Sequence, residues 1–234
     1  MINVAQIQAI SFDLDDTLWP IGPTIERAEA ALQAWLAVHS PMTAAVFSSP
    51  EAVREFREYM RVELPKIKPE LKYDMGAVRL EAIRLAMYRA GENPLLANEA
   101  YQAFYAARNK VDLFNCCRDV LAALSARYPL AALSNGNADI RLVGLGEYFK
   151  VAVSAREAKM AKPDTRIFDL TAQKLGVDNA EVLHVGDDAE LDCVGALKAG
   201  MQTVWINRSD TQWHHDVPQP VTVSSLSELL TLLS

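Results

Sequence analysis

Acidic residues crowd the end of a nearly apolar stretch near the start of the chain. The segment ISFDLDDTLWP, residues 10–20, places Asp13, Asp15 and Asp16 within four positions, with Thr17 directly after them. Like charges repel, and a carboxylate at the end of a buried segment is costly to ionise without a partner. The pattern therefore predicts that a positive group lies beside these acids.

Polar residues also follow other short apolar runs, and a lysine precedes one predicted helix. These further candidates are Ser134, Asn135, Lys162, Asp187, Asp188 and Asp192. The carboxyl ends of parallel strands meet at one edge of a sheet, so we expect all of these groups to converge. A few hard oxygen ligands beside a lysine suit Mg²⁺, which would let Asp13 and Asp187 stay ionised while a phosphate dianion approaches.

Two kinds of periodicity divide the chain. Apolar residues recur at helical spacing from residue 24 to about 110, whereas short apolar runs alternate with helical segments after about 111. The expected strands are 9–14, 130–133, 151–153, 182–185 and 203–206, and the expected helices between them are 118–126, 163–175 and 190–199. The sequence therefore predicts an α/β fold, a doubly wound parallel sheet formed by residues 1–20 and 111–234, with an all-helical domain inserted at 21–110.

Composition narrows the possible partners. The 234 residues include 23 basic and 30 acidic side chains, a net charge of −7, so no basic field exists to attract nucleic acid or an anionic membrane. Cys116, Cys117 and Cys193 are odd in number and lack metal-like spacing, which favours a reducing compartment. Because neither a signal peptide nor a membrane-spanning run is recognisable, we expect a cytoplasmic protein. The expected assembly is a monomer or a homodimer.

Four motifs together point to a family. FDLDDT, LSNGN, AKPDTRIF and HVGDDAELD, in this order, resemble the four signature motifs of the haloacid dehalogenase superfamily of phosphohydrolases. The resemblance covers about residues 7–20 and 111–210. It implies that Asp13 is the nucleophile that forms an aspartyl-phosphate, and that Asp15 is the general acid and base.

The same resemblance assigns ligands. The residues implied to hold the transferring phosphoryl group are Thr17, Ser134, Asn135 and Lys162. The implied Mg²⁺ ligands are the Asp13 side chain, the Asp15 backbone carbonyl and Asp187. Asp188 and Asp192 are expected beside these ligands, and which of the two reaches the metal is left open.

The inserted helices resemble the first cap class of the superfamily, whose members mostly act on small phosphorylated metabolites. Two longer stretches, LSNGNADIRLVGLGEYF and EVLHVGDDAELDCVGALKAGMQTVWI, resemble bacterial phosphatases of flavin mononucleotide and of the riboflavin precursor 5-amino-6-(5-phosphoribitylamino)uracil. The resemblance therefore implies a Mg²⁺-dependent phosphatase that hydrolyses one of these small metabolites. A closed cap would exclude water and macromolecules.

Several alternatives remain open. A sugar phosphatase or a phosphomutase would share the motifs, whereas a 2-haloacid dehalogenase would lack the acid that Asp15 supplies. A phospho-receiver module, which is not an enzyme, also surrounds an aspartate with carboxylates and a lysine, but it is about half as long. Less specific features have plainer interpretations: we expect 144–146 to be a turn, 214–216 a solvated loop, and His184 a packed core residue.

Overall fold

The computed structural model describes residues 2–47 and 49–233. By its internal contacts the chain divides into two compact units, Met1–Pro20 with Asp112–Ser234, here called the core unit, and Ile21–Val111, here called the helical unit. The sequence placed the second boundary one residue earlier, before Val111. Each unit is described by itself.

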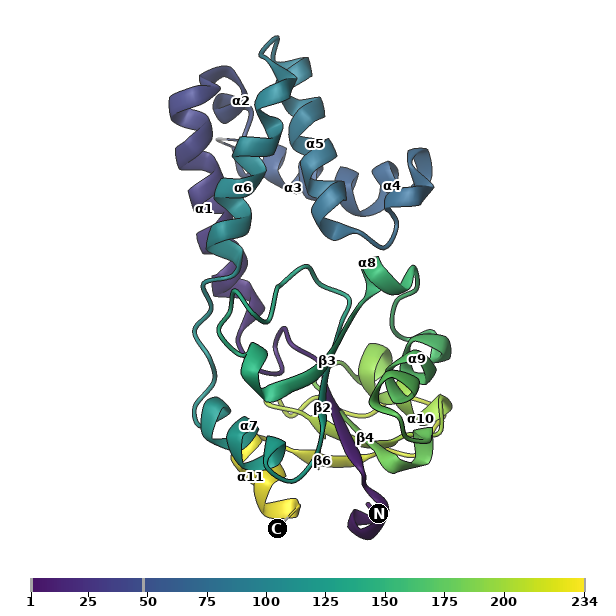
Figure 1. Cartoon of the computed structure of the whole chain (residues 1–234). Coiled ribbons are helices and arrows are strands. Elements are labelled where there is room, and N and C mark those ends of the chain that lie inside the picture. Colours follow the sequence, from purple (N-terminus) through teal and green to yellow (C-terminus); the bar gives the residue numbers. More distant parts are fainter. Residues whose placement is uncertain (1, 48, 234) are drawn as a thin grey trace. The chain divides into compact units, whose positions relative to one another are not determined.

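The core unit is built on a six-stranded parallel sheet with the strand order β3-β2-β1-β4-β5-β6 (Figure 1). The strands are β1 (Ala9–Phe12), β2 (Leu130–Ser134), β3 (Phe149–Ser154), β4 (Val182–Gly186), β5 (Gln202–Ile206) and β6 (Val221–Val223). All five predicted strands are present, although the first ends at Phe12 and not at Leu14. The edge strand β6 was not predicted, because three residues after a proline-rich loop are too few to show alternation.

Helices cover both faces of this sheet. Figure 1 shows α7 (Cys117–Ser125) and α11 (Leu226–Leu232) on one side, and α9 (Thr165–Leu175) and α10 (Gly195–Lys198) on the other, while the short α8 (Ala155–Ala158) follows β3. Every residue of β1, β2 and β4 is buried. Parallel strands covered on both faces read as continuous apolar runs, which is why the sequence revealed them. The predicted α/β class is confirmed.

The predicted helix 190–199 is a correction. Its first part is a π-helical turn, Ala189–Val194, and only Gly195–Lys198 is α-helical. A β-carbon on Gly195 would lie 2.7 Å from Cε2 of Phe168, so the glycine allows α10 to approach α9 closely. The two helices end at Leu175 and Lys198, within one residue of the predicted limits, and the glycines that follow, Gly176 and Gly200, have φ of 82° and 84°.

The sheet order places the site. From the central strand β1 the chain forms β2 and β3 on one side, then crosses to β4 on the other. Ligands of doubly wound sheets bind outside the carboxyl ends of the strands at such a reversal. The residues that follow β1, β2 and β4 are the candidates named from the sequence.

The helical unit contains α1 (Ile21–His39), α2 (Pro41–Val46), α3 (Pro50–Glu58), α4 (Leu64–Ile67), α5 (Met75–Arg89) and α6 (Ala97–Arg108). Its described residues form no strand, as predicted. Leu36, Ile83 and Phe104 lie in its main apolar cluster, at most 1% exposed. Among the described helices, none is long and apolar enough to cross a membrane.

Candidate active site

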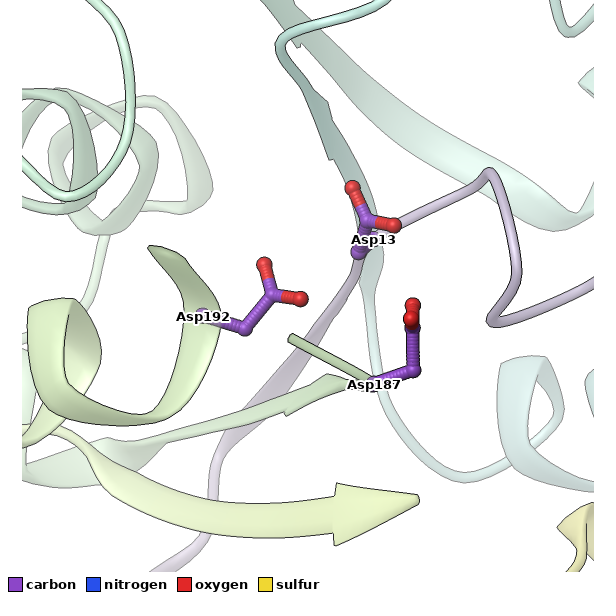
Figure 2. A group of neighbouring side chains, drawn as sticks. All are labelled: Asp13, Asp187 and Asp192. Atoms are coloured by element: carbon purple, nitrogen blue, oxygen red, sulfur yellow. The ribbon is translucent and has the colours of Figure 1, made fainter. Parts of the chain in front are cut away.

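Three carboxylates and one lysine meet at the carboxyl end of the sheet. Asp13 follows β1, Asp187 follows β4 and Asp192 lies in the π-helical turn, and one oxygen of each lies within 4.8 Å of the others. Figure 2 shows the three side chains facing a common space. Lys162, from the loop before α9, places its Nζ 2.5 Å from Oδ1 of Asp13 and 2.5 Å from Oδ1 of Asp192.

These charges are buried and unequal in number. The side chains of Lys162 and Asp192 are 3% and 1% exposed, and that of Asp13 is 11% exposed. One ammonium group therefore faces three carboxylates. When all three are ionised the site has a surplus of negative charge, which a divalent cation would balance.

The pKa values show the effect of this surplus. Burial raises the pKa of Asp13 well above its ordinary value, since Lys162 offsets the loss of water only in part. Burial likewise raises the pKa of Asp187 to about 7. Burial would also raise the pKa of Asp192, but the charge of Lys162 and the contact with His184 outweigh it, so that pKa is lowered.

The donor set fits Mg²⁺. Carboxylate oxygens from separate elements, gathered within one small space, are hard ligands of the kind this ion prefers. Asp13 and Asp187, which the resemblance implied as ligands, belong to this group. Asp192, which was expected beside them, offers an oxygen on equal terms, whereas the Asp15 carboxylate is not a member.

A buried polar chain holds Asp192 in place. His184 Nε2 lies 3.3 Å from Asp192 Oδ1, and His184 Nδ1 lies 2.7 Å from Ser11 Oγ. Since an ionised carboxylate only accepts, we assign the ring proton to Nε2, and the Ser11 hydroxyl donates to Nδ1. Burial lowers the pKa of His184, in keeping with a neutral ring. His184 is a packed core residue as predicted, but its support of Asp192 was missed.

Gly186 also shapes this side of the site. A β-carbon at this position would lie 2.3 Å from Cγ of Asp192. Any side chain here would displace the carboxylate, so the close approach requires glycine. The Asp188 backbone N–H adds a hydrogen bond of 3.0 Å to Asp192 Oδ2.

Asp187 is fixed at both its side chain and its backbone. The hydroxyl of Thr17 donates to Asp187 Oδ1 at 2.7 Å, and the indole N–H of Trp205 donates to the Asp187 carbonyl at 2.7 Å. Thr17 is fully buried. Thr17, which was expected to bind phosphate, therefore contacts a member of the acidic group. Trp205 also holds Asp187, and the sequence did not reveal this role.

Asp15 lies in the irregular loop between β1 and α1. The indole N–H of the buried Trp19 donates to Asp15 Oδ1 at 2.8 Å, and the Asp16 N–H donates to the Trp19 carbonyl at 2.7 Å. Asp16 has a φ of 57°, which turns the chain sharply. One oxygen of Asp15 is thus anchored by a tryptophan four residues further on. The sequence did not reveal this contact.

Residues after β2 position the lysine. Asn135 Oδ1 accepts from the Lys162 backbone N–H at 2.9 Å, and Asn135 Nδ2 donates to the Lys162 carbonyl at 3.0 Å. The side chain expected to bind phosphate therefore holds the backbone of Lys162. The hydroxyl of Ser134, 5% exposed, accepts from the Gly136 N–H at 2.9 Å.

Asp188 and the segments 144–146 and 214–216 were also singled out in the sequence. The exposed Asp188 caps the π-helical turn, because its Oδ1 accepts from the backbone N–H groups of Glu190 and Leu191. The expected solvated loop is partly a correction: His215 lies 3.1 Å from Glu190 Oε2 and packs edge-on against Trp213. The turn expected at 144–146 is confirmed at Gly144, with a φ of 79°, whereas Gly146 begins a short 3₁₀ helix.

Comparisons with known proteins identify the family of this chain. The family described as haloacid dehalogenase-like hydrolase matches residues 7–200. The chain is 32% identical to 5-amino-6-(5-phospho-D-ribitylamino)uracil phosphatase YigB of Escherichia coli (strain K12), over 98% of both proteins. It is 30% identical to glyceraldehyde 3-phosphate phosphatase of Methanopyrus kandleri, over 88% of this chain and 86% of that protein.

A solved structure is also similar. The crystal structure of 2-haloacid dehalogenase from Pseudomonas syringae pv. Tomato DC3000 is 34% identical, with a TM-score of 0.88, and the match covers 97% of this chain and 98% of that one. This chain belongs to the haloacid dehalogenase-like hydrolase family. It is therefore a hydrolase, as the four motifs predicted.

Proposed function

We propose that this protein is a Mg²⁺-dependent phosphatase that hydrolyses a small phosphorylated metabolite through an aspartyl-phosphate. The observation that carries the proposal is the group of Asp13, Asp187 and Asp192, with Lys162 in contact with two of these three carboxylates. Relatives named as phosphatases, which match most of the chain, support phosphoric monoester hydrolysis as the reaction class. The proposed Mg²⁺ ligands are the Asp13 and Asp187 side chains and the Asp15 backbone carbonyl, and Asp192 lies beside them.

In the first step, the free carboxylate oxygen of Asp13 attacks phosphorus. A new bond forms between this oxygen and phosphorus while the bond from phosphorus to the ester oxygen breaks. Lys162 already holds the other Asp13 oxygen and neutralises part of the charge on the transferring group. Asp15 gives its proton to the departing alkoxide, which leaves as an alcohol.

In the second step, water attacks the phosphorus of the aspartyl-phosphate. Asp15, now ionised, takes a proton from that water, and the bond between Asp13 and phosphorus breaks. Inorganic phosphate leaves, and both aspartates return to their starting states. Bound Mg²⁺ would stabilise the negative charge that gathers at the site in both steps.

For the substrate, we propose 5-amino-6-(5-phospho-D-ribitylamino)uracil, with flavin mononucleotide as a second substrate because it carries the same phosphorylated ribityl chain. The similarity to YigB over nearly the whole of both chains supports this choice. Both are small metabolites, and no nucleic acid or membrane partner is proposed for a chain with a net charge of −7. A cytoplasmic location remains a prediction.

Phosphate release from a panel of substrates tests the proposal. The panel holds the two ribityl phosphates, several sugar phosphates and glyceraldehyde 3-phosphate, each with Mg²⁺ and with a chelator. We expect turnover that stops on chelation and that is fastest with a ribityl phosphate. Fastest turnover of a sugar phosphate would overturn the substrate, and undiminished turnover with the chelator would overturn the metal.

A 2-haloacid dehalogenase is the second candidate, because a structure of that name is 34% identical and closely superimposes. In that reaction Asp13 would attack carbon and displace halide. The surplus of carboxylates disfavours this candidate, because displacement of halide from carbon needs no metal ion, and without one the anionic haloacid would approach three acids that Lys162 compensates only in part. Halide release from 2-chloropropionate in the presence of a chelator would favour it.

The remaining alternatives are separated by their products. A phosphomutase would return an isomerised sugar phosphate in place of free phosphate. A phospho-receiver would keep a stable phosphoryl group on an aspartate without turnover. Product analysis of the same panel, followed by mass spectrometry of the acid-quenched protein, distinguishes both from a phosphatase. The phosphatase is expected to carry its phosphoryl group on Asp13 only transiently.

A further inference from the structure

Arg208 follows β5 and forms two hydrogen bonds with the backbone of the loop that carries Asp15, an arrangement here called the grip. One terminal nitrogen donates to the Asp16 carbonyl at 2.6 Å, and the other donates to the Thr17 carbonyl at 2.9 Å. These two carbonyls are successive in the chain and come from a segment 191 or more residues away. Within the loop itself, the Asp16 N–H donates to the Trp19 carbonyl and the Leu18 N–H donates to the Leu14 carbonyl, so its backbone forms a tight turn. A planar guanidinium fork suits such a pair of acceptors.

Phe114 contacts both the Arg208 guanidinium and the backbone of the same loop. The guanidinium carbon of Arg208 lies 3.8 Å from the centre of the Phe114 ring, a cation–π contact. The Phe114 backbone N–H donates to the Leu18 carbonyl at 2.9 Å. Three successive carbonyls, those of Asp16, Thr17 and Leu18, are therefore held by Arg208 and Phe114 together.

The three held carbonyls come directly after Asp15 in the chain, so these contacts limit where the Asp15 side chain can lie. Trp19 anchors one Asp15 oxygen from inside the loop, while Arg208 fixes the loop backbone from outside. Lysine at position 208 would keep a positive charge but would lose the fork and most of the stacking. The contacts therefore require arginine, and they act on the backbone and not on a reacting atom.

We propose that Arg208 is a positioning residue, which holds the loop so that Asp15 delivers its proton to the leaving oxygen. This inference rests on the proposed phosphatase function. If Arg208 acts in this way, its loss should slow only those substrates whose leaving group is poor, because only a poor leaving group needs that proton. An alkyl phosphate releases a basic alkoxide, whereas p-nitrophenyl phosphate releases a phenolate that is stable without protonation.

The test compares these two substrate types in the full-length protein with Mg²⁺. We expect Arg208→Lys to lower kcat/KM about tenfold or more for the best alkyl phosphate of the panel, since small misplacements are costly, but less than about threefold for p-nitrophenyl phosphate. Asp15→Asn should show the same selectivity with a larger loss. The double variant should lose little beyond Asp15→Asn, because Arg208 acts through Asp15.

Arg127→Lys is the matched control. Arg127 also donates to a backbone carbonyl, that of Leu233, and lies over the Tyr128 ring, but it precedes β2 at the opposite edge of the sheet. We expect this variant to hydrolyse both substrates at the wild-type rate. If Arg208→Lys does not fold, Phe114→Leu tests the same grip, since its backbone hydrogen bond to Leu18 is retained.

The outcomes separate the two proposals. Wild-type protein that hydrolyses no phosphate ester overturns the proposed function itself. Active wild-type protein, with Arg208→Lys losing equal activity on both substrates or none, overturns only the positioning role. Additive losses in the double variant would also overturn it, because they would mean that Arg208 does not act through Asp15.

Discussion

The core unit and the helical unit differ in the kinds of side chain that they bury. At the carboxyl edge of the sheet, buried charged groups contact one another, with Lys162 between Asp13 and Asp192. Both units also bury apolar side chains, and those of the helical unit include Leu36, Ile83 and Phe104. The acidic cluster found among the described residues lies in the core unit. Buried charges are costly and require specific partners, whereas apolar contacts tolerate exchanges that conserve volume. We therefore expect substitutions at the acidic site of the core unit to affect chemistry first, and those in the helical unit to affect stability first.

The largest effect on chemistry is expected from Asp13→Asn. The amide keeps the shape of the side chain but removes the nucleophile, so turnover should fall by at least about 10⁴-fold. Steady-state phosphate release measures this loss. Asp169→Asn, at an exposed position on α9, is the control and should retain full activity. Turnover of Asp13→Asn within tenfold of wild type would contradict the assigned nucleophile.

Lys162→Met should affect stability as well as chemistry. It leaves Asp13 and Asp192 buried without their cation, and removing one partner of a buried ion pair costs about 3–5 kcal/mol. Denaturant unfolding followed in the presence of a chelator measures the loss. Added Mg²⁺ should restore part of it, since the ion supplies charge at the same place. Unchanged stability would mean that the pair does not exist in solution.

Ile83→Ala probes the other side of the comparison. Ile83 is fully buried in the helical unit, so truncation should destabilise by about 2–5 kcal/mol. Hydrogen exchange should quicken in peptides from α5 and α6. Mg²⁺ affinity, measured by calorimetry, should stay the same. A loss of Mg²⁺ affinity as large as that of a core-unit variant would break the distinction between the units.

Two glycines sharpen the distinction further. Gly186→Ala places a β-carbon against Asp192 and should weaken Mg²⁺ binding by about ten- to a hundredfold, an effect of about 1.4–2.8 kcal/mol. Gly22→Ala, in α1 of the helical unit, meets nothing within 4 Å. This control should leave Mg²⁺ binding unchanged and alter the free energy of unfolding by less than about 1 kcal/mol. Equal behaviour of the two variants would contradict the close approach at Gly186.

The smallest effect is expected from Trp205→Phe. Phenylalanine retains the ring but removes the donor to the Asp187 carbonyl, a hydrogen bond with a net contribution of about 0.5–1.5 kcal/mol. Mg²⁺ affinity should therefore fall about two- to tenfold, with kcat little changed. A fall in kcat without any change in Mg²⁺ affinity would argue against a role in positioning Asp187.

Much of the fold follows from local patterns. Buried parallel strands are short apolar runs, and Gly176 and Gly200 end helices because they adopt positive φ. Strand ends, the edge strand β6 and the π-helical turn were less predictable. Their limits depend on pairing and on close contacts such as that of Gly195 with Phe168, which leave no regular pattern in the sequence.

The sequence by itself determined which acids, which lysine and which hydroxyl-bearing residues follow the strands, and through them the family. The tertiary structure alone decided that Asp192 joins Asp13 and Asp187, that Asn135 holds the Lys162 backbone, and that Arg208 grips the Asp15 loop. The physical reason is separation along the chain. Asp13 and Lys162 are 149 positions apart, so their contact depends on strand order and register, which local propensity does not encode.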